Sequence, residues 1–278
     1  MKVKPRQCGL TLMEMTVVIA VMALLAVFGL PAIRALINSF ESEGGAKAMI
    51  SASLASARAI AAKEHHYAGI RFQKAYDPND PDILNAPQYM IFIVHDPAPK
   101  PKGTDLANGF RAVKGIKPIK LPDSLGVMDL RYRTNPNPRY SGDEPVDEDN
   151  DIDEPNEVRD TTTFSVIFSP SGKLVIHDVR VRNSNGVYQP DNDDPNPDKN
   201  SMDDIFNSPV NIDIHNTGMF IQDDYADLGL GQESSRRSFI IYDRTQFESV
   251  AENSRWSDYL KYLEVIYINP YTGTMIKK

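Results

Sequence analysis

A single carboxylate interrupts an otherwise apolar segment near the N-terminus. Glu14 is the only charged residue among the 21 residues from Leu10 to Leu30. Placing an ionised side chain at the centre of a hydrocarbon layer costs roughly 2.5–3.5 kcal/mol, and less near the edge, so this acid favours a partner of opposite charge. A cut between Gly9 and Leu10 would create an α-amino group, and that amine, on the same chain or a packed neighbour, would be such a partner. We therefore expect Glu14 to set the register between subunits.

Two later acidic segments carry residue types that could bind a cation. Residues 141–160 contain ten acids and one arginine, and residues 190–204 contain six acids and one lysine. The aspartates that alternate along the first segment are Asp147, Asp149, Asp151 and Asp153. A twelve-residue calcium loop needs glycine at its sixth position, and no register of either segment supplies one. The composition favours solvated loops, with calcium binding as the alternative; no other cofactor is expected.

No residue pattern indicates catalysis. The chain lacks G-x-S-x-G, H-E-x-x-H and Walker motifs, and Cys8 is its only cysteine. His95, His177 and His215 each lie near an aspartate, but a Ser–His–Asp set can be assembled on paper from almost any chain of this composition. We therefore expect no enzyme. The formal net charge of −8 offers no basic face for nucleic acid, so none is expected as a partner.

The element that must position Glu14 is a helix. Residues 10–30 are long and apolar enough to span a bilayer, and the basic leader MKVKPRQCG predicts a cytoplasmic N-terminus. Pro31 should kink the helix, because proline removes one backbone hydrogen bond. We expect residues 1–9 to be a leader and residues 10–66 to be one long helix, transmembrane over 10–30 and amphipathic over 31–66. The expected location is the inner (cytoplasmic) membrane, as a single-pass protein whose head is periplasmic or extracellular.

The second part of this helix carries one apolar stripe. Its residues recur at spacings of three and four, which is typical of a helix that buries one face. They are Ala46, Met49, Ile50, Ser53, Leu54, Ala57, Ile60 and Ala61. Because half of these side chains are alanine or serine, we expect the helix to pack closely against a sheet.

Residues 67–278 predict a β-rich head. Short runs rich in β-branched and aromatic residues, bounded by Pro, Gly, Asn or Asp, are typical of strands. They cover 67–73, 88–96, 110–121, 126–133, 162–170, 173–182, 237–244 and 263–270. A weaker helix is expected over 245–260, where Trp256 and Tyr259 are interpreted as packing residues.

The N-terminus resembles that of type IV prepilins and type II secretion pseudopilins. The residues that carry the resemblance are a basic leader ending in Gly9, glutamate as the fifth residue after it, and Pro31. The resemblance implies a prepilin peptidase that cuts between Gly9 and Leu10 and methylates the new N-terminus. Most members of the family begin the processed chain with phenylalanine, whereas this chain would begin with leucine.

The head resembles the minor pseudopilin H group. The motifs are SASLASARAIAAKEHHYAGIRF, FSPSG and INPYTGTM, which are short and degenerate. The resemblance implies an α+β, pilin-like lollipop: a long hydrophobic helix packed on an antiparallel, β-rich head. It implies a structural subunit of a type II secretion pseudopilus, with other pseudopilins or pilins, membrane lipid and an inner-membrane assembly platform as partners. The alternatives are a minor pilin of a type IV pilus or competence system and a membrane-anchored β-domain that binds a ligand.

Overall fold

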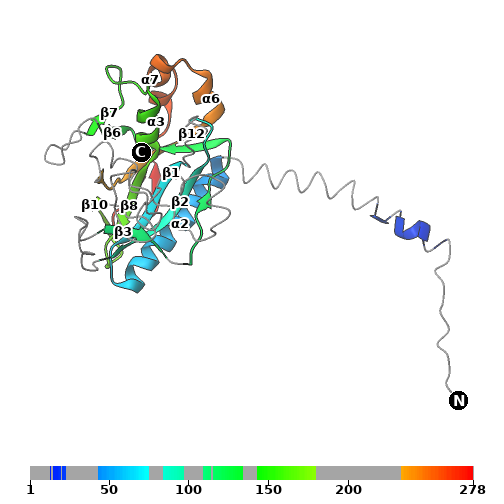
Figure 1. Ribbon diagram of the computed structural model, residues 1–278. Helices are drawn as coiled ribbons and strands as arrows, with labels where there is room; N and C mark the ends of the chain where they lie inside the picture. Colours follow the sequence, from blue (N-terminus) through cyan, green and yellow to red (C-terminus); the bar gives the residue numbers. More distant parts are fainter. Residues whose placement is uncertain are drawn as a thin grey trace, which may run out of the picture.

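Antiparallel strands, the helix α2 and several shorter helices build the head of the protein (Figure 1). The structure, a computed structural model, describes residues 13, 15–19, 21–22, 43–74, 84–96, 109–113, 115–133, 143–179 and 233–277. The longest helix in contact with the head's strands is α2 (Glu43–Glu64). It ends three residues before the first strand, so the chain turns directly from helix into sheet.

The first sheet contains the strands that follow α2. Its order is β3-β2-β1-β8-β9, and β4 also pairs with β2. These strands are β1 (Ala68–Lys74), β2 (Gln88–Asp96), β3 (Gly109–Ala112), β4 (Ile119–Lys120), β8 (Phe164–Phe168) and β9 (Leu174–Val175). β1 lies between β2 and β8 and pairs antiparallel with both. Every residue of β1 is buried, so this strand is the centre of the sheet.

A second sheet has the order β14-β13-β12-β5. Its strands are β5 (Leu125–Met128), β12 (Ser238–Asp243), β13 (Ile266–Ile268) and β14 (Met275–Lys277). Two shorter pairs complete the described strands: β6 (Arg131–Arg133) with β7 (Asp143–Pro145), and β10 (Asp178–Val179) with β11 (Glu233–Ser234). All of these pairings are antiparallel, which agrees with the β-rich head that the sequence predicts.

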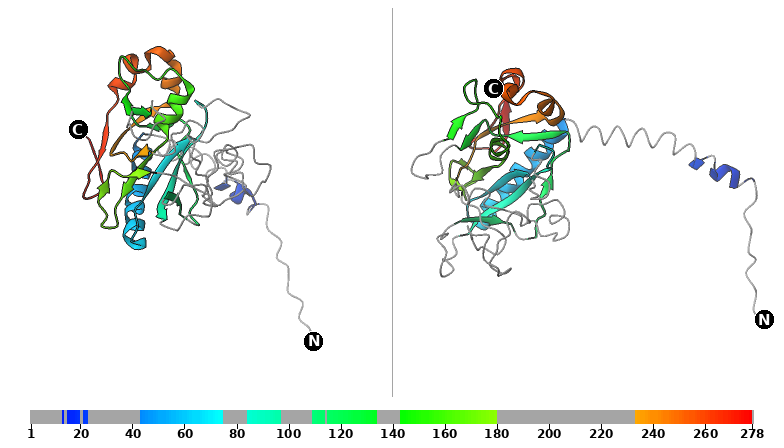
Figure 2. Two further views of the ribbon diagram at one scale, coloured as in Figure 1. Left: turned by 60° about the vertical axis from the view of Figure 1, so that its left-hand side comes forward. Right: turned by 45° about the horizontal axis from the view of Figure 1, so that its top comes forward.

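Helix α2 buries the stripe of small residues that its sequence predicts. Ala46, Ile50, Ser53, Leu54, Ala57 and Ala61 are buried, and Met49 and Ile60 pack at the edge of the same core. That core includes Ile70 and Phe72 of β1 and also Phe239 and Ile266 of the second sheet. One helix face therefore packs in the same apolar core as residues of both sheets. Figure 2 shows α2 lying beside the strands β1 and β2 of the first sheet.

Gln88 joins the two sheets at the start of β2. Its side chain is 2% exposed. The side-chain amide nitrogen donates to the carbonyl oxygens of Val127 (2.7 Å) and Thr162 (2.8 Å), and its oxygen accepts from the Val127 amide at 2.7 Å. Burying a side-chain amide costs little free energy when it has three hydrogen-bond partners, whereas a buried amide without partners would destabilise the fold. The residue therefore fixes β5 against β2 through backbone groups.

The expected α+β lollipop with a long hydrophobic helix is wrong. Over the described residues the fold is mostly sheet with short helices, and none of those helices is long and apolar. The longest, α2, has 22 residues and carries charged residues such as Lys47 and Arg58. Near the N-terminus, Met13, residues 15–19 and residues 21–22 are helical, but their side chains are exposed, with Met13 at 78%. A helix is stabilised mainly by burying a face, and these residues bury none.

The expected location in the inner membrane is corrected by the same finding. Within the described residues, no helix combines the length and the hydropathy needed to cross a bilayer. The expectation came from the length and hydropathy of residues 10–30 and from the basic leader before them, which are properties of the sequence.

Several predicted strands are divided, and one helix was not expected. The runs 110–121, 126–133 and 173–182 each form two short strands. The predicted helix over 245–260 is a series of single turns: α6 (Arg244–Ser249), η1 (Glu252–Ser254), α7 (Arg255–Asp258) and η2 (Leu260–Tyr262). Helix α3 (Pro155–Thr162) lies in the acidic segment and gathers with α6 and α7 at one end of the head (Figure 1).

Candidate functional site

The residues predicted to act in processing and assembly lie outside the described residues. They are Gly9, Leu10, Glu14 and Pro31. Their described neighbour Thr16 donates a side-chain hydrogen bond to the Met13 carbonyl at 2.8 Å, as hydroxyls do within helices. The roles of these four residues therefore stay predictions that depend on the sequence alone.

The acidic segment folds onto the head instead of forming a wholly solvated loop. Val146, Ile152 and Val158 are each at most 2% exposed. They pack with Met128, Ile240, Tyr242, Phe247 and Leu260 in a separate core. In the sequence, the indication of this burial was three aliphatic residues spaced among ten acids. The acidic composition of the segment led instead to the expectation of a solvated loop. The second acidic segment, 190–204, lies outside the described residues.

Two of the four alternating aspartates, Asp147 and Asp151, accept hydrogen bonds from backbone amides. One Asp147 side-chain oxygen accepts from the amides of Asp149 (3.0 Å) and Asn150 (3.1 Å). One Asp151 oxygen accepts from the amides of Ile152 (2.7 Å) and Trp256 (2.9 Å), the second of which belongs to α7. These bonds stabilise the turn and attach it to the C-terminal helices.

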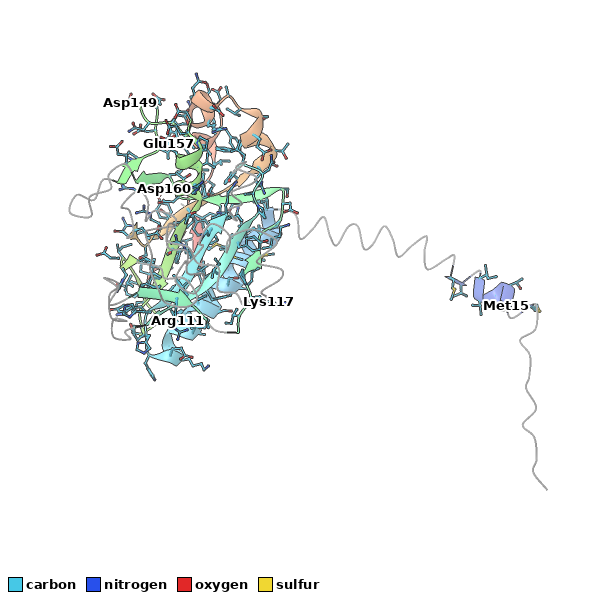
Figure 3. The ribbon with its side chains drawn as sticks, in the orientation of Figure 1. Met15, Arg111, Lys117, Asp149, Glu157 and Asp160 are labelled. Atoms are coloured by element: carbon cyan, nitrogen blue, oxygen red, sulfur yellow. The ribbon has the colours of Figure 1, made fainter. Side chains whose placement is uncertain are left out.

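Three further acids of this segment lie at the start of α3: Asp153, Glu154 and Glu157. Glu157 accepts from the amides of Asp153 (3.0 Å) and Glu154 (2.9 Å), which satisfies donors that a helix N-terminus leaves unpaired. Burial raises the pKa of Glu157, while the two amide bonds act in the opposite direction. Asp149 lies toward the outside of the segment and Asp160 nearer the body of the head (Figure 3). Across the described residues no three His, Cys, Asp or Glu side chains form a metal-binding group, so calcium stays an untested alternative.

Arg58 of α2 holds two glycine turns side by side. Its Nε donates to the Gly172 carbonyl at 2.7 Å and its Nη1 to the Thr272 carbonyl at 3.0 Å. The first turn joins β8 to β9 and the second joins β13 to β14, and the amide of Leu174 donates to the Pro270 carbonyl at 2.8 Å. Gly172 and Gly273 have φ of 74° and 71°, a conformation that glycine adopts without strain. The motifs FSPSG and INPYTGTM therefore meet on one helix.

A buried polar cluster lies on the face of β1 opposite α2. Arg71 and Glu233 form an ion pair at 2.7 Å, and their side chains are 2% and 4% exposed. Arg71 also donates to Gln73 at 3.0 Å and to Ser165 at 3.4 Å, and Ser165 donates to Glu233 at 3.0 Å. Buried charges persist when they are paired and bonded in this way. The cluster ties β1, β8 and β11 together.

Two histidines pack in an aromatic group on the first sheet. The rings of His95 and His177 are 6.0 Å apart, and Tyr67 and Phe110 contact both. His177 Nδ1 lies 2.6 Å from the Asp178 carbonyl oxygen. These contacts are packing contacts and give no nucleophile with an adjacent base. His215 lies outside the described residues, and the expectation that the protein is not an enzyme stays a prediction.

A cavity of about 530 Å³ lies beside the first turn of α2. Its wall comes from α2, from β12 with its following turn, and from the C-terminal turns before β13. The lining includes four charged side chains and two tyrosines, which can interact with polar or cationic groups of a ligand: Glu43, Lys47, Asp243, Glu264, Tyr259 and Tyr262. Sequence reasoning missed this cavity, because its residues are separated by up to 221 positions between Glu43 and Glu264 and form no local motif.

Hydrogen bonds and ion pairs fix the walls of the cavity. Lys47 forms ion pairs with Glu43 and, at 3.8 Å, with Glu264. The Asp243 amide donates to the Tyr259 hydroxyl at 2.7 Å, and an Asp243 side-chain oxygen accepts from the Gln246 amide at 3.0 Å. Burial raises the pKa of Tyr259, and the negative charges of Asp243 and Glu43 raise it further, against the effect of the amide bond.

Comparisons of the chain with protein-family models, with curated proteins and with solved structures found no match.

Proposed function

We propose that the chain is a pilin-like structural subunit, a minor pseudopilin of a type II secretion pseudopilus. The observation that carries this proposal is the combination of a basic leader ending in Gly9, Glu14 five residues later, and Pro31. Four features at fixed spacing form a more specific pattern than an apolar run alone. In this proposal the chain is cut between Gly9 and Leu10, and the new N-terminus is methylated.

The role of Glu14 follows from its charge. Once Leu10 has a free amine, the carboxylate of Glu14 pairs with that amine or with the amine of a neighbouring subunit. The pair offsets the cost of placing a lone carboxylate among apolar side chains, and it admits a neighbour in one register only. The partners are prepilin peptidase, other pseudopilins and the assembly platform of the filament.

The head supports the proposal through the way that α2 enters the sheet. The helix of small residues packs across the antiparallel strands and runs directly into β1. Arg58 attaches both glycine turns to it, so the head and the helix form one body. A subunit that transmits contacts between helix and head needs such a rigid joint.

Intact-mass spectrometry of the full chain, purified from cells with an active prepilin peptidase, tests the proposal. We expect a mass that lacks residues 1–9 and gains one methyl group. Gly9→Val should leave the chain uncut, and Gln7→Val, which places the same side chain two residues away, should be cut normally. A full-length mass for the wild-type chain would remove the filament function.

Glu14→Ala tests the assembly step separately. We expect normal cutting, because the cut site is unchanged, and loss of co-purification with the other pseudopilins. Glu14→Asp, which keeps the charge on a shorter side chain, should recover part of it. Normal assembly of Glu14→Ala would show that Glu14 does not set the register.

A further inference from the structure

The cavity beside α2 has an excess of negative charge. Its charged lining residues are Glu43, Asp243 and Glu264 against Lys47, which gives a net charge of −2. The ammonium of Lys47 is shared between two of these carboxylates. A recessed wall of low dielectric concentrates the field of such charges, so a cation gains more there than at an open surface.

Aromatic faces accompany the carboxylates. Tyr259 and Tyr262 both line the cavity, and Tyr262 is 73% exposed. Lys261 places its ammonium 5.1 Å from the centroid of the Tyr262 ring, so this ring already makes the contact that attracts a cation to an aromatic face. The Tyr259 hydroxyl is neutral at physiological pH, as tyrosine ordinarily is, and burial raises its pKa further, so it adds no negative charge to the cavity.

The volume and shape suit a side chain with its flanking backbone. The cavity of about 530 Å³ is within the range of about 300–1,000 Å³ that is typical of ligand pockets. Leu263 and Ile266 give it apolar walls beside the charged ones. A guanidinium matches this combination, because its plane stacks on tyrosine and its edge donates two parallel hydrogen bonds to a carboxylate.

We propose that this cavity binds an arginine side chain presented by a peptide segment of a partner protein. The carboxylates of Glu43 and Glu264 receive the guanidinium, and Tyr262 covers its face. Binding at this place joins the partner to the first turn of α2. The inference does not depend on the filament proposal, because it rests on residues of the head alone.

Fluorescence anisotropy of a labelled peptide, Ac-Gly-Arg-Gly, titrated with the full chain tests the site. The control peptide contains citrulline, which keeps nearly the shape of arginine but is neutral and has a carbonyl oxygen in place of one guanidinium NH2 donor. We expect the citrulline peptide to bind at least about fivefold more weakly, and binding of the arginine peptide to weaken with salt. Equal binding of the two peptides, or no binding of the arginine peptide, would overturn the proposal.

Substitutions that should weaken or strengthen peptide binding test whether the peptide lies in the cavity. Glu264→Gln and Glu43→Gln should each weaken binding about twofold to fivefold, the range for partly exposed ion pairs. Lys47→Gln should strengthen it, because it removes the competing ammonium. Glu64→Gln, at the other end of α2, is the matched control and should change nothing. If Glu64→Gln weakens binding as much as Glu43→Gln, the peptide responds to the overall charge and the cavity is not its site.

Discussion

The two faces of β1 are both buried but by opposite means. Toward α2 the strand presents Ala68, Ile70 and Phe72, which pack in an apolar core. On the other face it presents Gly69, Arg71 and Gln73, and these too are buried. The first face is held by removal of apolar surface from water, whereas the second depends on pairing of each polar group. The apolar face of β1 therefore tolerates small changes in side-chain size, whereas the polar face does not tolerate the loss of a hydrogen-bonding or charged partner.

The largest effect is expected when one member of the buried pair is removed. Arg71→Met leaves the Glu233 carboxylate buried without its cation, which should cost about 3–5 kcal/mol of unfolding free energy. Urea unfolding followed by circular dichroism measures the change. The double variant Arg71→Met with Glu233→Leu should recover most of it, because no charge is then left alone. A double variant as unstable as the single one would show that packing, and not charge, holds this face.

A smaller loss is expected on the apolar face. Leu54→Ala removes a fully buried side chain between α2 and the sheets and should cost about 2–5 kcal/mol, depending on how far the neighbours relax. The exposed Ala55 provides a control: Ala55→Leu, on the outward side of α2, should change stability by no more than about 0.5 kcal/mol. In contrast to the Arg71 variant, no second substitution of a charged residue should rescue Leu54→Ala.

Gly69 tests the close contact between neighbouring strands on the polar face. A Cβ at this position would lie 2.0 Å from the Val166 carbonyl oxygen of β8, which is backbone and cannot rotate away. We expect Gly69→Ala to lower the unfolding free energy by about 1–3 kcal/mol, the range for overpacking. Thermal unfolding would check this. An unchanged melting temperature would mean that β1 and β8 separate without cost.

The smallest effect at neutral pH is expected for a buried hydroxyl. Tyr242 is 1% exposed, and its hydroxyl has no hydrogen-bond partner within the described residues, in contrast to Arg71. Tyr242→Phe should leave the unfolding free energy unchanged or raise it slightly at pH 7, because no bond is lost.

The same variant should change the response to alkali. Burial raises the pKa of Tyr242 above its usual value near 10. The stability that comes from the neutral hydroxyl is fully present below about pH 10 and is lost as pH rises toward the folded pKa. Tyr242→Phe should therefore flatten the fall in unfolding free energy above pH 10. An identical pH profile for the two proteins would show that this hydroxyl does not titrate with unfolding.

Patterns within one element were predictable, and contacts between distant segments were not. The buried stripe of α2 and the bounds of β2 follow from local periodicity, and the structure confirms both. Burial of Arg71 was not predictable, because alternation along β1 cannot show that β11, 159 residues after Lys74, supplies Glu233. Val146, Ile152 and Val158 were concealed by the charge around them. The expected membrane helix was wrong: no helix of the described residues is long and apolar enough to cross a bilayer.

The Arg58 contacts have a consequence for how the protein is made. Arg58 is 114 residues from Gly172 and 214 residues from Thr272 in the chain. A ribosome synthesises α2 well before the turn that supplies its last anchor, the Thr272 carbonyl. Arg58 therefore has only one of its two anchors until the β13–β14 turn has been synthesised, and a chain that stops before this turn would never gain the second.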